Sequence, residues 1–187
     1  MKFNLELLSN KTGKGNLLVL KKYRFPNGRM FPDSYINFVN EYGYGLSANM
    51  FIIYIPLEDS DDSFFIRSQE IIATYQEVLN DESELWFDLL PDMSFSLLKD
   101  LVPFAMSENG HYLFWNTQSK SSDEFDIYLT DFRGTGFIRV ASNLYDFFAK
   151  VTSVSSYKEV LPFQTKVLPK TFMPLPYPNQ LSYPSIG

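Results

Sequence analysis

Few residues of the types that carry out catalysis occur in this chain of 187 residues. His111 is the single histidine and cysteine is absent, which leaves no set of side chains for a zinc or haem site and excludes thiol catalysis. A serine–histidine–acid triad would have to use His111, but no Gly-x-Ser-x-Gly motif supplies its nucleophile. Because His111 follows a turn signal and begins an apolar segment, we interpret it as an ordinary strand residue.

Acidic residues gather at two places in the sequence: Asp59, Asp61 and Asp62, and then Asp123 and Glu124. The first group resembles a calcium loop, but the required glycine and the distant bidentate glutamate are missing. Asp126, close to the second group, could serve as one member of a glycosidase pair, yet nothing in the sequence supplies the other member. Helix capping and solvation account for the first group more simply, and acids that flank a strand, as in the second group, are commonplace.

Two glycine-rich segments complete the search for chemistry. Residues 13–15 lack the spacing of a phosphate-binding loop, and residues 133–136 precede a predicted strand instead of opening a helix. Both segments are therefore interpreted as turns. We expect no catalytic residue, no metal and no cofactor.

Composition and charge limit the partners. With 45% hydrophobic and 17% aromatic residues, the chain can form one well-packed domain. A net charge of −6 disfavours nucleic-acid binding, which needs clustered cations, and favours a basic partner, although moderate negative charge also serves solubility alone. No apolar run is long enough to cross a membrane and no secretory signal opens the sequence, so we expect a cytoplasmic protein without membrane contact.

The elements that must position these residues follow from the periodicity of the apolar residues. Helical spacing predicts helices near residues 33–42, 64–80 and 143–152. β-branched and aromatic runs predict strands near residues 50–55, 101–106, 111–116, 125–130 and 137–140. Residues 1–25 predict two short elements around a turn, for which a hairpin is one arrangement. Residues 85–90 are either a short helix or a strand.

Two turn signals are specific enough to define a geometry. Asn109-Gly110 between two strands predicts a type I′ hairpin turn, in which both residues take positive φ. Gly43 can adopt the left-handed conformation that ends the helix of residues 33–42. Residues 162–187 hold six of the 11 prolines, so we divide the chain into a domain of residues 1–161 and a proline-rich extension. The extension either lies along the domain or is available to a partner.

Several strings of residues, in order, resemble the SUKH superfamily, which includes the fungal cell-wall (glucan) synthesis regulator and many bacterial immunity proteins. The strings are residues 32–39 followed by Tyr42-Gly43-Tyr44-Gly45, then residues 51–56, 104–115, 124–131 and 143–147. The resemblance spans roughly residues 30–152. It leaves residues 1–25 and the proline-rich extension outside the pattern.

This resemblance implies an α+β fold with a central, mostly antiparallel sheet flanked by helices, and a non-enzymatic role in binding another protein. An immunity protein that neutralises a cognate toxin, such as a basic nuclease, is the first interpretation, and a regulatory scaffold in cell-wall synthesis or signalling is the alternative. No catalytic residue is carried over, and the sequence leaves the oligomeric state undetermined.

Two sets of residues are candidates for contacting a partner. The first is the acidic set on predicted loops, Asp59, Asp61, Asp62, Asp123 and Glu124, which would face a basic toxin. The second is a groove lined by Glu108, Trp115 and Asp131, whose alternative interpretation is that they hold the fold.

Overall fold

The computed structural model describes residues 1–89, 93–133 and 136–176. Its centre is an eight-stranded sheet in the order β1-β8-β2-β3-β4-β5-β6-β7, antiparallel throughout except for the parallel pair β1 and β8. The strands are β1 (Glu6–Leu7), β2 (Gly45–Ser47), β3 (Phe51–Ile53), β4 (Leu101–Ser107), β5 (Tyr112–Asn116), β6 (Asp126–Thr130), β7 (Ile138–Ala141) and β8 (Thr171–Pro174). The α+β class and the mostly antiparallel sheet are confirmed.

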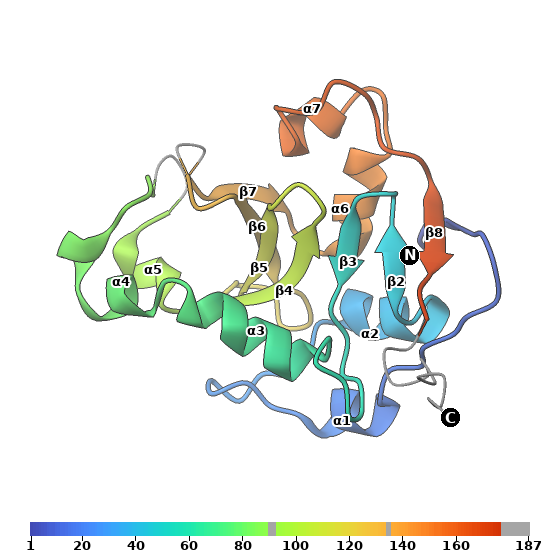
Figure 1. Cartoon of the computed structure of the whole chain (residues 1–187), viewed down its shortest axis with the longest axis horizontal. Helices are drawn as coiled ribbons and strands as arrows, with labels where there is room; N and C mark the ends of the chain where they lie inside the picture. The colour runs from blue at the N-terminus through green and yellow to red at the C-terminus, as the bar shows by residue number, and fades with distance from the viewer. Residues whose placement is uncertain (90–92, 134–135, 177–187) are drawn as a thin grey trace, which may run out of the picture.

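The helical elements lie around this sheet (Figure 1). They are α1 (Leu17–Lys22), α2 (Asp33–Glu41), α3 (Phe64–Ala73), α4 (Gln76–Asn80), the 3-10 helix η1 (Glu82–Glu84), α5 (Phe95–Leu98), α6 (Leu144–Val151) and α7 (Tyr157–Val160). α3 packs along β4, and α2 packs beside α6. No helix in the described ranges has the length and apolar character needed to cross a membrane.

The predicted helix over residues 64–80 is divided into α3 and α4. The Thr74 hydroxyl donates to the Ile71 carbonyl at 2.7 Å, and the Tyr75 N–H bonds to the Ile72 carbonyl, which tightens and ends the first helix. Tyr75 leaves the helical conformation and is buried against Phe114 and Phe132. Burial of this aromatic ring therefore overrides the helical periodicity. Residues 85–89 form neither a helix nor a strand.

The hairpin considered for residues 1–25 is wrong. Asn16 caps α1, because its side-chain oxygen accepts hydrogen bonds from the N–H groups of Leu18 and Val19 at 3.1 and 3.0 Å. β1 pairs instead with β8, from the proline-rich extension. A pairing between segments so distant in sequence leaves no local signal. Within the extension, residues 171–174 form β8 and lie in the sheet between β1 and β2, while residues 177–187 lie outside the described part of the chain.

The type I′ turn predicted at Asn109-Gly110 is also wrong. Gly110 has a positive φ of 79°, whereas Asn109 does not. The Gly110 N–H bonds to the Ser107 carbonyl at 3.1 Å, and the Ser107 N–H bonds to the His111 carbonyl at 2.7 Å. This is a three-residue loop in which a turn is followed by a left-handed glycine.

Consecutive positive φ values occur at Ala48 (52°) and Asn49 (53°), between β2 and β3. The Met50 N–H closes this turn on the Ser47 carbonyl at 3.0 Å. Type I′ geometry therefore lies at this turn. The sequence did not indicate it, because alanine rarely adopts the left-handed conformation.

Two glycines allow distant segments to approach β2. Gly43 ends α2 with φ 78°, as predicted, and a Cβ atom there would lie 2.1 Å from the Gly13 carbonyl oxygen. A Cβ atom on Gly45 would lie 2.4 Å from the Met173 carbonyl oxygen. Glycine at these positions lets both the N-terminal segment and β8 pack closely against the start of β2.

The core is largely aromatic and centres on Trp115, which is 1% exposed. Its ring stacks on Phe104 with a centroid distance of 4.1 Å and an interplanar angle of 4°. Five further rings meet it at larger angles: those of Phe25, Phe31, Tyr35, Phe64 and Phe125. Side chains from α2, α3, the sheet and the segment before α2 therefore share one cluster.

The left-handed conformation of Gly110 gives a first prediction. Gly110→Val should lower the free energy of unfolding by about 1 kcal/mol or more, because a β-branched residue is strained at positive φ. No atom would contact the new Cβ, so this cost comes from the backbone. Asn109→Ala is the control and should have a smaller effect. Thermal denaturation measures both variants, and equal melting temperatures for Gly110→Val and the wild type would contradict the turn geometry.

Candidate functional site

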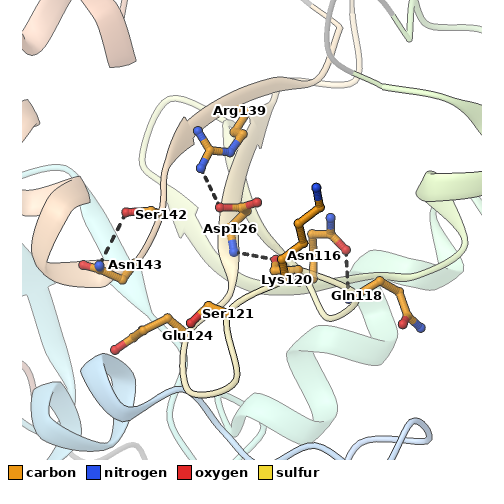
Figure 2. Close-up of a pocket in the computed structure, with 10 residues that line it drawn as sticks. Asn116, Gln118, Lys120, Ser121, Glu124, Asp126, Arg139, Ser142 and Asn143 are labelled. Carbon is orange, nitrogen blue, oxygen red and sulfur yellow. Dashed lines mark hydrogen bonds and ion pairs between the residues drawn. The ribbon is translucent and has the colours of Figure 1, made fainter.

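A polar hollow of about 550 Å³ lies where the loop between β5 and β6 meets β7 and the start of α6 (Figure 2). We call it the polar cleft. It is lined by Asn116, Gln118, Ser119, Lys120, Ser121, Glu124, Asp126, Arg139, Ser142 and Asn143. Two stretches of the chain, residues 116–126 and 139–143, therefore form one surface that is rich in hydrogen-bonding groups.

Arg29, from the segment before α2, holds the β5–β6 loop in shape. Its guanidinium lies 4.3 Å from the centre of the Phe125 ring. It donates to five backbone carbonyls of the loop, those of Thr117, Ser119, Ser121, Ser122 and Glu124. All five hydrogen bonds come from the two terminal nitrogens of the planar guanidinium, Nη1 and Nη2, so this loop is folded around one cation. Burial lowers the pKa of Arg29, and Asp123 opposes that shift.

Ser34, at the start of α2, joins the loop to both flanking helices. Ser34 is 1% exposed. Its N–H and hydroxyl donate to the two carboxylate oxygens of Glu124 at 2.9 and 2.6 Å. The same hydroxyl accepts the N–H of Leu144, the first residue of α6, at 3.1 Å. Glu124 therefore satisfies unpaired N-terminal groups of α2, and Ser34 does the same for α6.

The charged residues of the cleft floor are paired with each other. Arg139 on β7 and Asp126 on β6 form an ion pair of 2.6 Å, and the hydrogen bond to Asp126 raises the pKa of Arg139 (Figure 2). The Asp126 N–H donates to the Ser119 hydroxyl at 2.8 Å. Asp126 thus interacts with Arg139, and its pairing with a second acid in a glycosidase arrangement gains no support.

Asn143 and Ser142 form the cleft wall at the start of α6. The Asn143 side chain accepts the N–H of Asp146 at 2.8 Å, and the Asp146 carboxylate accepts the N–H of Ser142 at 3.1 Å. A second hollow of about 550 Å³ shares Ser142 and Asn143 and continues along α6 past Tyr145. The two hollows therefore meet at the start of α6, and hydrogen bonds within the chain fix the backbone of the wall that they share.

The five predicted acidic residues fall on two loops and in two environments. Asp59 and Asp61 are exposed on the β3–α3 loop, whereas Asp62 on the same loop accepts the Tyr44 hydroxyl at 2.9 Å and pairs with Arg67 at 2.6 Å. On the β5–β6 loop, Asp123 is exposed and Glu124 is half-buried against Ser34. Asp62 and Glu124 therefore hold the fold, while the other three are accessible at the surface.

Glu108, Trp115 and Asp131 differ in their surroundings and do not share one function. Trp115 lies in the core, so it fills space there and does not form the wall of an open groove. Glu108 is exposed in the β4–β5 turn, and Asp131 follows β6 near His111.

His111 is part of the packing of the β4–β5 hairpin. Its ring stacks on Phe163 at 4.0 Å, and burial lowers its pKa while Asp131 opposes that shift. The Ser107 hydroxyl lies 3.4 Å from His111 Nδ1, but Ser107 is buried and its oxygen accepts the His111 backbone N–H at 3.0 Å. In the described ranges, no three acidic, cysteine or histidine side chains are grouped to hold a metal ion.

Sequence reasoning missed the residues that shape the cleft, namely Arg29, Ser34 and Arg139. Arg29 follows the Asn27-Gly28 turn, which gives no indication of a loop about 90 residues away. Ser34 falls at the start of the helix predicted near residues 33–42, but its contacts with Glu124 and Leu144 arise only when distant segments pack together.

The model of the family SUKH_6, described as SMI1-KNR4 cell-wall, matches residues 27–148 of the chain. This range contains every residue that lines the polar cleft, together with Arg29 and Ser34. It leaves β1, α1, α7 and β8 outside. Searches among curated proteins and among solved structures give no match.

Replacing Arg29 tests how the cleft loop is held. Arg29→Ala should lower the free energy of unfolding by about 2–4 kcal/mol, because several carbonyls lose their donor at once. Arg29→Lys should retain only a minor part of the stability that Arg29→Ala loses, since an ammonium group has three donors. Urea denaturation measures the effect, with exposed Arg24→Ala as control, expected to change stability by about 0.5 kcal/mol or less. Equal losses in Arg24→Ala and Arg29→Ala would contradict this role.

Glu124 gives a prediction for pH. Burial raises its pKa above the ordinary 4.5, and the Ser34 hydrogen bonds oppose that shift in part. The stability that it contributes is therefore fully present below its ordinary pKa and is lost as the pH rises through its raised pKa in the folded protein. Subtracting the unfolding free energy of Glu124→Gln from that of the wild type should give a difference that falls over this range. Exposed Glu82→Gln is the control, and a difference that rises with pH would contradict the shift.

Proposed function

The chain belongs to the SUKH_6 family (SMI1-KNR4 cell-wall), and from this premise we propose that it is an immunity protein that binds and neutralises a protein toxin. The family match over residues 27–148 is the observation that carries the proposal, because the SUKH superfamily that the sequence resembles includes many immunity proteins. The polar cleft lies wholly within the matched range. Its binding role rests on the geometry described above.

The arrangement of the cleft favours binding over catalysis. Asp126 is paired with Arg139, Glu124 is hydrogen-bonded to Ser34, and Asp146 is paired with Lys150 at 2.9 Å. A general acid or base needs a proton that it can exchange with a substrate, whereas these carboxylates are held by partners in the chain. A surface that is already rigid loses little conformational entropy when a partner binds.

The surface acids support a basic partner. Asp59, Asp61 and Asp123 are exposed, so they are the members of the acidic set that can contact a toxin without disturbing the fold. A nuclease toxin must be basic where it holds phosphate, and an inhibitor can use that same basic surface. The proposed contact is therefore electrostatic and mainly accelerates association.

A regulatory scaffold in cell-wall synthesis or signalling is the second candidate function. The description of the matched family, which names the cell wall, favours it. A scaffold would bind several partners with moderate affinity, whereas an immunity protein would bind one toxin tightly. Identifying the proteins that copurify with the tagged chain distinguishes the two functions.

Neutralising the exposed acids tests the immunity proposal, with the product of a gene adjacent to that of this chain as the candidate toxin. The triple variant Asp59→Asn/Asp61→Asn/Asp123→Asn should lower the association rate about tenfold or more at low salt, and this difference should shrink as salt rises. The control, Glu77→Gln/Glu82→Gln/Glu84→Gln, removes the same charge from exposed positions in α4 and η1. Stopped-flow fluorescence measures both rates. Equal rates for the two variants would place the toxin interface elsewhere, and toxin that remains active with the wild type would contradict immunity itself.

A further inference from the structure

Charge is distributed unevenly along this acidic chain. Residues 1–31 hold seven of the 16 cationic residues and one of the 22 acidic residues. The cations are Lys2, Lys11, Lys14, Lys21, Lys22, Arg24 and Arg29. With Arg29 engaged by the cleft loop, the others lie exposed on the N-terminal segment. This segment is therefore a basic region on a protein whose remainder is strongly acidic.

α1 places two leucines among these cations. Its Leu20 is fully buried, but Leu17 is 44% exposed and Leu18 is 61% exposed. Residues four apart lie on the same side of a helix, so Leu17 aligns with Lys21 and Leu18 with Lys22. The outer side of α1 is thus apolar at its start and cationic at its end.

The acidic β3–α3 loop lies directly beside α1. The Asn16 N–H bonds to the Pro56 carbonyl at 2.8 Å, and the Asn16 side chain donates to the Glu58 carboxylate at 2.6 Å. Figure 1 shows this loop next to α1. Asp59 and Asp61 are exposed on the loop. Exposed leucines therefore have cations on the same helix and anions on the neighbouring loop.

Within the described part of the chain, the lysines of α1 and the acids at 59 and 61 form no salt bridge with each other or with other residues. Among the described residues, the salt bridges join Arg67, Arg139 and Lys150 to their acids. Unpaired charges of both signs around exposed apolar side chains have the composition of a protein interface, with an apolar centre and a polar rim.

We propose that this surface, formed by Leu17, Leu18, Lys21, Lys22, Asp59 and Asp61, binds a second copy of the chain about a two-fold axis. In such a contact each protomer presents the same patch. If a first group on one protomer contacts a second group on its partner, the second group on that protomer also contacts the first group on the partner. The α1 lysines of one protomer face the acidic loop of its partner, twice, and the leucines pack between them. A patch that carries both signs side by side is complementary to its own copy.

The same charges argue against partners of one sign. An anionic membrane would be attracted by the lysines but repelled by the acidic loop beside them. A basic protein can contact the acidic loop alone, but a uniformly acidic or basic protein that covers the whole surface would meet like charge on one half of it. A partner with both signs in matching order satisfies both halves, and the second copy has that order.

The dimer does not depend on the proposed function. It does share Asp59 and Asp61 with the residues proposed to face a toxin, so one loop cannot serve both at once. A toxin that occupies the acidic loop would then dissociate the dimer. The test below uses the chain alone and is decided without any toxin.

The test is sedimentation velocity over a concentration series with two complementary variants. Lys21→Glu/Lys22→Glu and Asp59→Lys/Asp61→Lys should each weaken self-association at least about tenfold, because like charges then face each other in both contacts. Mixing the two variants should restore dimers, since both contacts across a two-fold axis again join opposite charges. Restoration in the mixture depends on the proposed pairing and would not follow from a general effect of charge.

Leu17→Ser/Leu18→Ser should also abolish the dimer, whereas the control Leu8→Ser/Val154→Ser changes two exposed apolar residues elsewhere and should leave it intact. Circular dichroism checks that each variant is folded. A wild type that stays monomeric up to about 500 μM would overturn the proposal, since weak dimers with a Kd near 100 μM are populated there. The proposal would also be overturned if the mixed variants stay monomeric. Flotation of the monomeric wild type with phosphatidylserine vesicles would overturn it as well, because the surface would then bind an anionic membrane.

Discussion

The buried hydroxyl of Ser34 and the guanidinium of Arg29 are the polar contacts on which the central region depends. Ser34 links Glu124 to the start of α6, and Arg29 gathers five carbonyls of the β5–β6 loop. Arg29 lies just before α2 and Ser34 lies in its first turn, and both act on the same loop. Buried polar groups are costly when unpaired, so these contacts fix one arrangement of the loop and of the two helices. The polar cleft is the surface that results.

The acidic residues of this chain serve two purposes that the sequence does not separate. Asp62 and Glu124 lie within hydrogen-bond networks, whereas Asp59, Asp61 and Asp123 project into solvent. Neutralising all five at once would disturb folding and partner contacts together. Asp59, Asp61 and Asp123 are therefore the acids that can attract a basic partner. The basic N-terminal segment lies beside Asp59 and Asp61, so positive and negative charges are neighbours on this part of the surface.

The segments outside the family match extend the sheet. β1 and β8 come from opposite ends of the chain and pair with each other, and β8 then pairs with β2. Gly43 and Gly45 make this addition possible, since any side chain there would meet the carbonyls of Gly13 and Met173. Phe172 on β8 is fully buried against Phe38 and Tyr42 of the central domain. The added strands therefore share the core of the matched region.

The sequence by itself determined the α+β class, α2, α6 and the strands from β3 to β7, because apolar periodicity and turn residues are local properties of the chain. The left-handed end of α2 at Gly43 was likewise evident from residue type. Only the tertiary structure decided the pairing of β1 with β8, the division at Tyr75 and the role of Arg29. Each of these depends on contacts between residues far apart in sequence, and their energy overrides or supplements local preference. The same reason separates Glu124 from Asp123: adjacent acids differ in role because only one of them faces Ser34.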